Sequence, residues 1–138
     1  MLLLGPSALA DDAFAARLGA AAARIRLVAP WLPARALPPP GRRFARDFRA
    51  RYGAAPTSSA VYGYEAMRLV LRAIGRAGAR GDDRMDVTRG AFAPAARGSA
   101  LGAFAVDAAG DTSLHAFGAY AVRGGRLAFL RLVDTRAP

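Results

Sequence analysis

The sequence predicts an α/β fold composed of a parallel βαβ unit, two long helices and a C-terminal β-hairpin. Three observations predict it. Residues 1–30 follow the order strand, helix, strand, and two amphipathic helical stretches follow a proline-rich segment. The end of the chain holds two β-like runs around Gly124-Gly125. A length of 138 residues suits one domain with its own core.

The βαβ unit begins with residues 2–4, three leucines that predict a short buried strand ending at the loop from Gly5 to Ser7. Asp11 and Asp12 predict the start of a helix over residues 13–23, because carboxylates favour the positive end of a helix. Residues 25–28 predict the second strand, parallel to the first. Since two parallel strands do not form a stable sheet, we expect its other strands to lie outside this chain or on a partner.

The middle of the chain predicts a linker and two amphipathic helices. Residues 31–40 contain four prolines after Trp31 and cannot stay helical for long. Residues 42–52 predict a helix, because Phe44, Phe48 and Tyr52 recur at every fourth position, and Gly53 predicts its end.

The second of these helices is predicted to begin near Pro56 and to run to about residue 77. Its apolar stripe includes Tyr64, Met67 and Leu71, and Glu65 is placed to form an i,i+3 ion pair with Arg68. Beyond a glycine-containing break, Asp82 and Asp83 predict the start of a short third helix.

The C-terminal part predicts β structure. Residues 104–106 predict a strand and residues 107–111 a turn. Residues 114–122 and 127–133 predict two strands joined by the two-residue hairpin turn at Gly124-Gly125.

The formal net charge is +10, and every basic residue is arginine. One interpretation is a nucleic-acid-binding protein that uses the dense arginine run from Arg42 to Arg51. The other is a solvated arginine-rich surface, which fits the spread of the remaining arginines along the chain. We expect the second and therefore no nucleic-acid partner.

Several function classes lack their residues. The chain has no cysteine, and His115 is its only histidine, so neither a catalytic nucleophile–base pair nor a usual zinc ligand set is present. Asp82, Asp83 and Asp86 are explained by a helix N-terminus rather than a metal. We expect no enzyme activity, no metal and no cofactor. The N-terminus lacks the basic residues and the long apolar run of a signal peptide, and no stretch is long and apolar enough for a membrane helix.

Four stretches resemble the C-terminal part of type I periplasmic solute-binding proteins, the leucine/isoleucine/valine-binding group of ABC importers. Phe44-x3-Phe48-x3-Tyr52-Gly53-x2-Pro56 resembles that family's "F…F…YG..P" helix, and Ala60-Val61-Tyr62-Gly63-Tyr64-Glu65-Ala66 resembles its "gYDA" helix start. Gly102-x-Phe104-x2-Asp107-x2-Gly110-Asp111 resembles its "G…FD..GD" turn. Leu27-Val28-Ala29-Pro30 is similar to a strand that ends one lobe.

The resemblance implies an incomplete type I periplasmic-binding-protein fold and a truncated fragment whose N-terminal part is missing. Residues 1–30 would be a βαβ piece of one lobe, 31–40 a crossover linker, and 41–138 the helices and C-terminal strands. The implied function is binding of a small polar or carboxylated solute, such as an amino acid, between two lobes for a membrane permease. The implied location is periplasmic, or extracellular and membrane-associated. The alternative within this fold is a ligand-sensing receptor domain.

The resemblance also implies which residues contact the ligand: Ser7, Trp31, Tyr62 and Tyr64. Each has a structural interpretation as well, because a serine can cap a helix or turn and aromatic residues can fill a core or cover an edge. At the position of Ser7, amino-acid binders of the family carry an acidic residue that holds the ligand ammonium. Glu65 could accept an ammonium, but we expect it to pair with Arg68.

Overall fold

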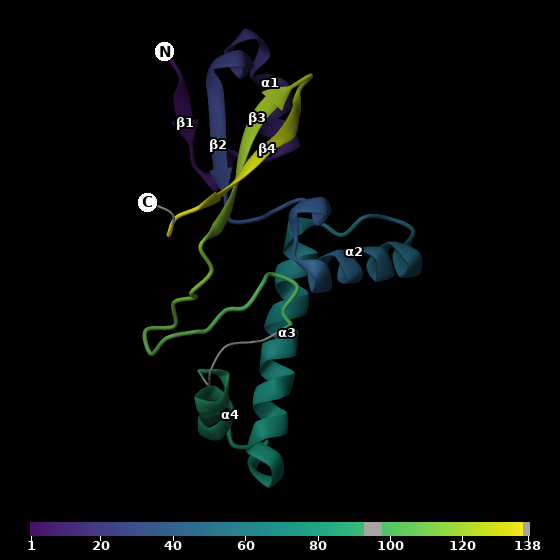
Figure 1. The fold of residues 1–138 in the computed structure, drawn as a ribbon, viewed down its shortest axis with the longest axis vertical. Coiled ribbons are helices and arrows are strands. Elements are labelled where there is room, and N and C mark those ends of the chain that lie inside the picture. The colour runs from purple at the N-terminus through teal and green to yellow at the C-terminus, as the bar shows by residue number, and fades with distance from the viewer. Residues whose placement is uncertain (93–97, 137–138) are drawn as a thin grey trace. The chain divides into compact units, whose positions relative to one another are not determined.

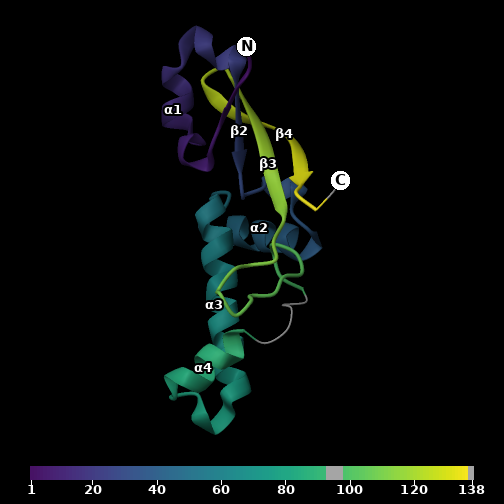
Figure 2. The ribbon, with the colours of Figure 1, turned by 90° about the vertical axis from the view of Figure 1, so that its left-hand side faces the viewer.

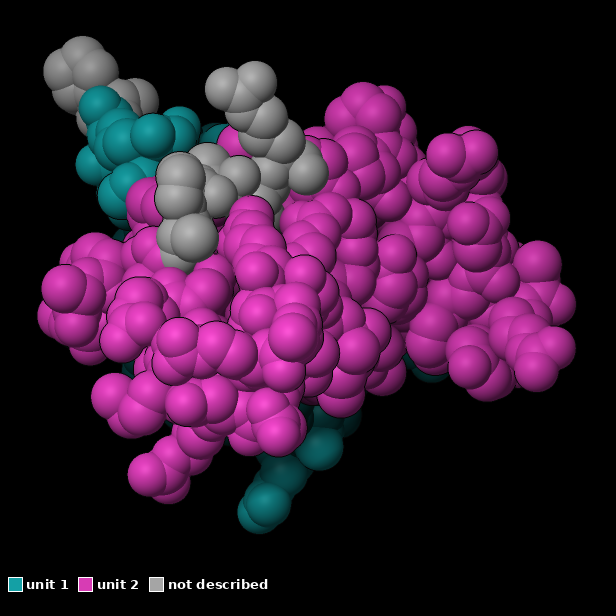
Figure 3. Space-filling model, turned by 90° about the horizontal axis from the view of Figure 1, so that it is seen from below, with its two compact units in different colours: residues 1–36, 115–138 teal, residues 37–114 magenta. Residues whose placement is uncertain are grey.

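The computed structural model describes residues 1–92 and 98–136, and the chain divides into two compact units. Unit 1 comprises Met1–Ala36 and His115–Pro138, and unit 2 comprises Leu37–Leu114. Figure 3 colours the two units separately. The earlier division at residues 30 and 40 into pieces of two lobes stays a prediction.

Unit 1 is built on a four-stranded sheet in the order β1-β2-β3-β4 (Figure 1). Strands β1 (Leu3–Gly5) and β2 (Ile25–Ala29) are parallel, as predicted. The predicted hairpin forms from β3 (Ala116–Arg123) and β4 (Arg126–Asp134), and β3 pairs antiparallel with β2. The expectation that the remaining strands lie outside this chain is therefore wrong, because the hairpin extends the sheet from within the same chain.

The prediction of a buried first strand is also wrong. Strand β1 lies at an edge of the sheet, and Leu2, Leu3 and Leu4 are 63%, 47% and 75% exposed. The core of unit 1 lies instead around β2 and β3, where Ala10, Leu27, Ala29 and Tyr120 are buried together.

The predicted helix over residues 13–23 is two shorter elements. Helix α1 (Asp12–Arg17) begins at the N-cap Asp11, whose Oδ1 accepts a hydrogen bond of 2.6 Å from the Phe14 N–H. Gly19 then adopts φ +49°, which an α-helix does not allow, and the chain continues as the 3₁₀ helix η2 (Gly19–Arg24). Figure 2 shows α1 beside the sheet, where its Asp12 Oδ1 accepts from the Leu127 N–H of β4 at 2.9 Å.

Unit 2 contains α2 (Pro39–Tyr52), α3 (Ser58–Ala77) and α4 (Arg84–Ala91). Helix α2 starts inside the predicted linker, because proline at the first helical positions needs no N–H partner. Gly53 ends α2 with φ +72°, as predicted, and the Asp83 side chain caps α4. The short 3₁₀ helix η4 (Gly78–Arg80) follows α3 in unit 2, whereas the 3₁₀ helix η3 (Ala34–Ala36) belongs to unit 1.

The predicted strand over residues 104–106 does not form. Only Val106 makes a β-bridge, to Thr112, across the predicted turn, and Asp107 Oδ1 accepts from the N–H groups of Ala109 and Asp111. The turn residues therefore satisfy their own backbone locally, and no neighbouring strand is needed.

Candidate functional site

Ser7 and Trp31 follow the two parallel strands of unit 1. Ser7 begins the 3₁₀ helix η1 (Ser7–Leu9) two residues beyond β1, and Trp31 lies two residues beyond β2. Because parallel strands end at the same edge of a sheet, both residues lie at its carboxyl edge. Both are half-buried. This is the edge at which open α/β sheets bind ligands.

Trp31 is held by contacts within unit 1. Its carbonyl oxygen accepts a hydrogen bond of 2.8 Å from the Tyr120 hydroxyl, and its side chain packs against the buried cluster. The Tyr120 hydroxyl can reach the Trp31 carbonyl oxygen only because residue 118 is glycine. A Cβ at Gly118 would lie 2.6 Å from that carbonyl oxygen and 2.8 Å from the Tyr120 hydroxyl. Trp31 therefore has structural contacts within unit 1, and its contact with a ligand stays a prediction.

Tyr62 and Tyr64 lie near the start of α3 in unit 2. Tyr62 is half-buried, and burial raises the pKa of its phenol above the ordinary value, so it stays protonated at neutral pH. Tyr64 is 40% exposed. Its ring stacks on Phe44 of α2 with a centroid separation of 4.4 Å, and the Arg68 guanidinium carbon lies 5.4 Å from the same ring.

Glu65 ties α3 to the segment that follows residue 97. It is only 2% exposed, and its Oε1 accepts hydrogen bonds from Arg68 Nη1 at 2.9 Å and from the Ala100 N–H at 2.7 Å. Arg68 also donates to the Gly98 carbonyl oxygen at 3.3 Å. The predicted Glu65–Arg68 pair is confirmed, and the same oxygen, Oε1, also accepts from the Ala100 N–H. The buried carboxylate therefore already has a cationic partner within unit 2.

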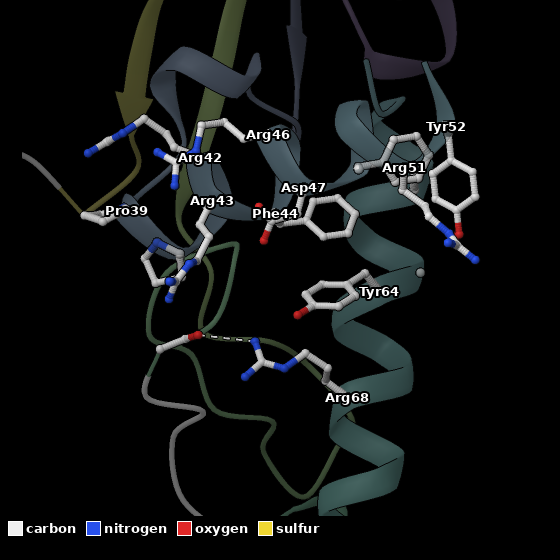
Figure 4. A pocket seen from close by; sticks show the side chains of 15 residues that line it. Pro39, Arg42, Arg43, Phe44, Arg46, Asp47, Arg51, Tyr52, Tyr64 and Arg68 are labelled. Carbon is white, nitrogen blue, oxygen red and sulfur yellow. Dashed lines mark hydrogen bonds between the residues drawn. The ribbon is translucent and has the colours of Figure 1, made fainter. Parts of the chain in front are cut away.

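A groove of about 1180 Å³ lies between α2 and α3, entirely within unit 2 (Figure 4). We call it the α2–α3 groove. Five arginines line it against a single aspartate, and four aromatic residues contribute to its walls. These residues are Arg42, Arg43, Arg46, Arg51, Arg68, Asp47, Phe44, Phe48, Tyr52 and Tyr64.

Sequence reasoning missed this groove. It placed Phe44 and Tyr64 on separate apolar stripes and treated the arginines of α2 as a solvated face. The signal was present in the alternation of arginine and aromatic residues along residues 42–52, but the partner helix that closes the groove was not predictable from that spacing.

The described residues provide neither a cluster of metal-ligating side chains nor a membrane-spanning helix. Within residues 1–92 and 98–136, no three His, Cys, Asp or Glu side chains are grouped so that they could hold a metal ion. None of the helices described there has the length and apolar character needed to cross a membrane.

Solved structures give close fold matches. LivK, a leucine-binding protein from Thermotoga maritima, matches with a TM-score of 0.77 at 22% identity over 96% of this chain. A solute-binding protein of an ABC transporter from R. palustris, solved in complex with benzoate, matches with a TM-score of 0.72 at 25% identity over 97%. A putative branched-chain amino acid ABC transporter protein from Rhodospirillum rubrum matches with a TM-score of 0.68 at 27% identity over 94%.

The chain spans only 36–37% of the length of these three proteins. Its mixed sheet and helices therefore correspond to a part of the type I periplasmic-binding-protein fold. No curated protein sequence matches the chain.

The family evidence rests on sequence as well as on shape. The model of the family described as periplasmic binding protein matches residues 1–117, which is most of the 138-residue chain. The matched structures include substrate-binding proteins of ABC transporters. The predicted family resemblance is confirmed, and the chain belongs to the periplasmic binding protein family.

Proposed function

We propose that this chain is part of an extracytoplasmic solute-binding protein of an ABC importer and binds a small carboxylated solute. The observation that carries the proposal is the family match over residues 1–117, together with the benzoate-bound neighbour of 25% identity. In the whole protein, two lobes would close around the solute by a hinge motion and present it to a membrane permease. Such a role is not enzymatic.

The ligand contacts of unit 1 are assigned to the carboxyl edge of its sheet. Ser7 would donate its hydroxyl to a carboxylate oxygen, and the Trp31 ring would wall the site and exclude water. Tyr62 and Tyr64 are proposed to contribute from unit 2. Because Ser7 is uncharged and Glu65 is bound by Arg68 and Ala100, none of the proposed contacts neutralises a ligand ammonium. The ligand class favoured is a carboxylate without an α-amino group.

Benzoate is therefore expected to bind the chain more tightly than L-leucine. Trp31 is the only tryptophan, so its indole N–H gives one resonance whose shift can be followed by NMR during titration. Since only part of a two-lobed site is present, we expect a dissociation constant of about 1 mM or weaker. Ser7→Ala should weaken benzoate by about three- to tenfold, the effect of one lost hydrogen bond.

Thr88→Ala is the matched control, because Thr88 is an exposed hydroxyl residue on α4. It should leave the benzoate titration unchanged. Tighter binding of L-leucine would contradict the assigned ligand class while keeping the solute-binding function. The absence of a saturable shift with either compound would count against the site itself.

The two-lobe proposal has a separate test in the DNA that precedes the Met1 codon. We expect that DNA to encode, in or near frame, the part of the fold that the longer neighbours contain and this chain does not. An unrelated gene with its own promoter at that place would contradict a role as one part of a longer binding protein.

A further inference from the structure

The α2–α3 groove combines an excess of positive charge with a stacked aromatic pair. Its lining carries five arginines against one aspartate, and it contains the stacked pair Phe44–Tyr64. Arginine and aromatic residues are enriched in protein interfaces and at their energetic hot spots, whereas charged residues as a class are depleted there. The groove therefore has the composition of a docking site.

The floor of the groove is built before any partner binds. Tyr64 stacks on Phe44, and Arg68 lies over the Tyr64 ring while bonded to Glu65 and to the Gly98 carbonyl oxygen. Figure 4 shows the Tyr64 hydroxyl directed into the space below α2. Arg68 is thus fixed by three contacts, which reduces the entropy that a partner must overcome on binding.

The wall formed by α2 supplies the free charge. Arg43, Arg46 and Arg51 are exposed, and the structure gives them no ion pair with any described residue. Arg42 donates to the Leu37 carbonyl oxygen of its own segment at 2.8 Å. Three guanidinium groups spread over more than two turns of α2 suit an extended occupant that carries several carboxylates.

A second copy of this chain is a poor occupant. Each copy carries a net charge of +10, so two copies repel. Many of its acidic residues are already used locally: Asp11 and Asp83 cap helices, Glu65 is buried, and Asp86 pairs with Arg80 and Arg89. The positive charge of the arginines that line the groove favours a partner with acidic residues at its contact surface.

We propose that the α2–α3 groove binds an acidic segment of a partner protein that also carries an aromatic side chain. The carboxylates of the segment would pair with Arg43 and Arg46, and its aromatic ring would pack beside Tyr64 and the 67%-exposed Tyr52. This site lies in unit 2 and uses none of the unit 1 residues assigned to the solute, but it shares Tyr64 with the proposed solute contacts. It goes beyond the proposed function because its occupant is a protein segment and its charge comes from the arginines of α2.

The probe is a fluorescein-labelled peptide of glutamates around one phenylalanine, titrated with the full chain and followed by fluorescence anisotropy. We expect saturable binding that weakens with salt, because exposed ion pairs are screened. The double variant Arg43→Gln/Arg46→Gln should bind about tenfold more weakly, the effect of losing two exposed ion pairs. Replacing the phenylalanine of the peptide by alanine should weaken binding as well.

The control variant Arg24→Gln/Arg123→Gln removes the same charge from exposed positions of unit 1. It should change affinity less than twofold, because neither arginine is among the residues that line the α2–α3 groove. Equal loss in both double variants would reduce the effect to net charge and overturn the proposal. Tighter binding of duplex DNA, lost in the Arg43/Arg46 variant, would assign the groove to nucleic acid instead. Failure to bind the peptide even at low salt would also overturn it.

Discussion

Glu65→Ala is expected to lower the free energy of unfolding by about 3 kcal/mol. The substitution removes the carboxylate oxygen that accepts from the Ala100 N–H. Leaving such a buried N–H group unsatisfied costs about 1–3 kcal/mol. It also leaves Arg68 without its counterion. Breaking a fully buried ion pair costs about 3–5 kcal/mol, but the Arg68 side chain is 29% exposed and can partly rehydrate, so the total stays near the lower end.

The measurement is urea unfolding of the full chain followed by circular dichroism at 222 nm, a signal to which α2 and α3 contribute strongly. Glu65→Gln should have a smaller effect, because its amide oxygen can still accept from the Ala100 N–H while the charge is lost. The matched control is Asp82→Ala, which removes an exposed carboxylate and should cost less than about 0.5 kcal/mol. If Glu65→Ala and Asp82→Ala have equal effects, the Glu65 bridge contributes nothing to stability.

The elements with local signals were predictable from the sequence. The arginine–aromatic periodicity of residues 42–52, the glycine after it and the aspartate before α4 each act within a few residues of their own position. The parallel pairing of β1 and β2 followed from a short strand–helix–strand order and is confirmed.

The predictions that are wrong concern features set by residues far apart in the sequence. The side of β2 that β3 occupies is decided by residues about 90 positions apart, such as Leu27 and Tyr120, and no local pattern encodes that pairing. For the same reason, the leucines of β1 were expected to be buried, although their place at the edge of the sheet depends on the whole strand order.

The same distinction between local and distant contacts decides which features of the candidate site could be predicted. Ser7, Trp31, Tyr62 and Tyr64 were chosen by resemblance, and their ligand contacts stay predictions. Glu65 was expected to pair with Arg68, which lies one helical turn away, and it does. Its second partner, the Ala100 N–H, is 35 residues distant and could not be inferred from helical spacing. The α2–α3 groove was missed for the same physical reason.

Gly41→Ala is expected to destabilise the chain by about 2 kcal/mol, although alanine is the better helix former. Gly41 is buried in α2, and a Cβ there would overlap the Ala100 carbonyl oxygen and lie 2.8 Å from the Leu37 Cβ. The main clash is with backbone, which cannot rotate away as a side chain can. Overpacking typically costs about 1–3 kcal/mol, which exceeds the gain of about 1 kcal/mol from helix propensity.

Gly75→Ala makes the same change in α3, but we expect it to raise the free energy of unfolding rather than lower it. Among the described residues, a Cβ at Gly75 would meet no atom within 4 Å beyond its neighbours in the chain and the backbone of α3. Helix propensity therefore dominates, and the variant should be stabilised by up to about 1 kcal/mol. Urea unfolding of the two variants side by side therefore separates the packing of α2 on Ala100 from propensity. Stabilisation by both substitutions would show that α2 does not pack closely on Ala100. The same contact holds the backbone whose N–H binds Glu65, so Gly41→Ala and Glu65→Ala should combine non-additively in a double-mutant cycle.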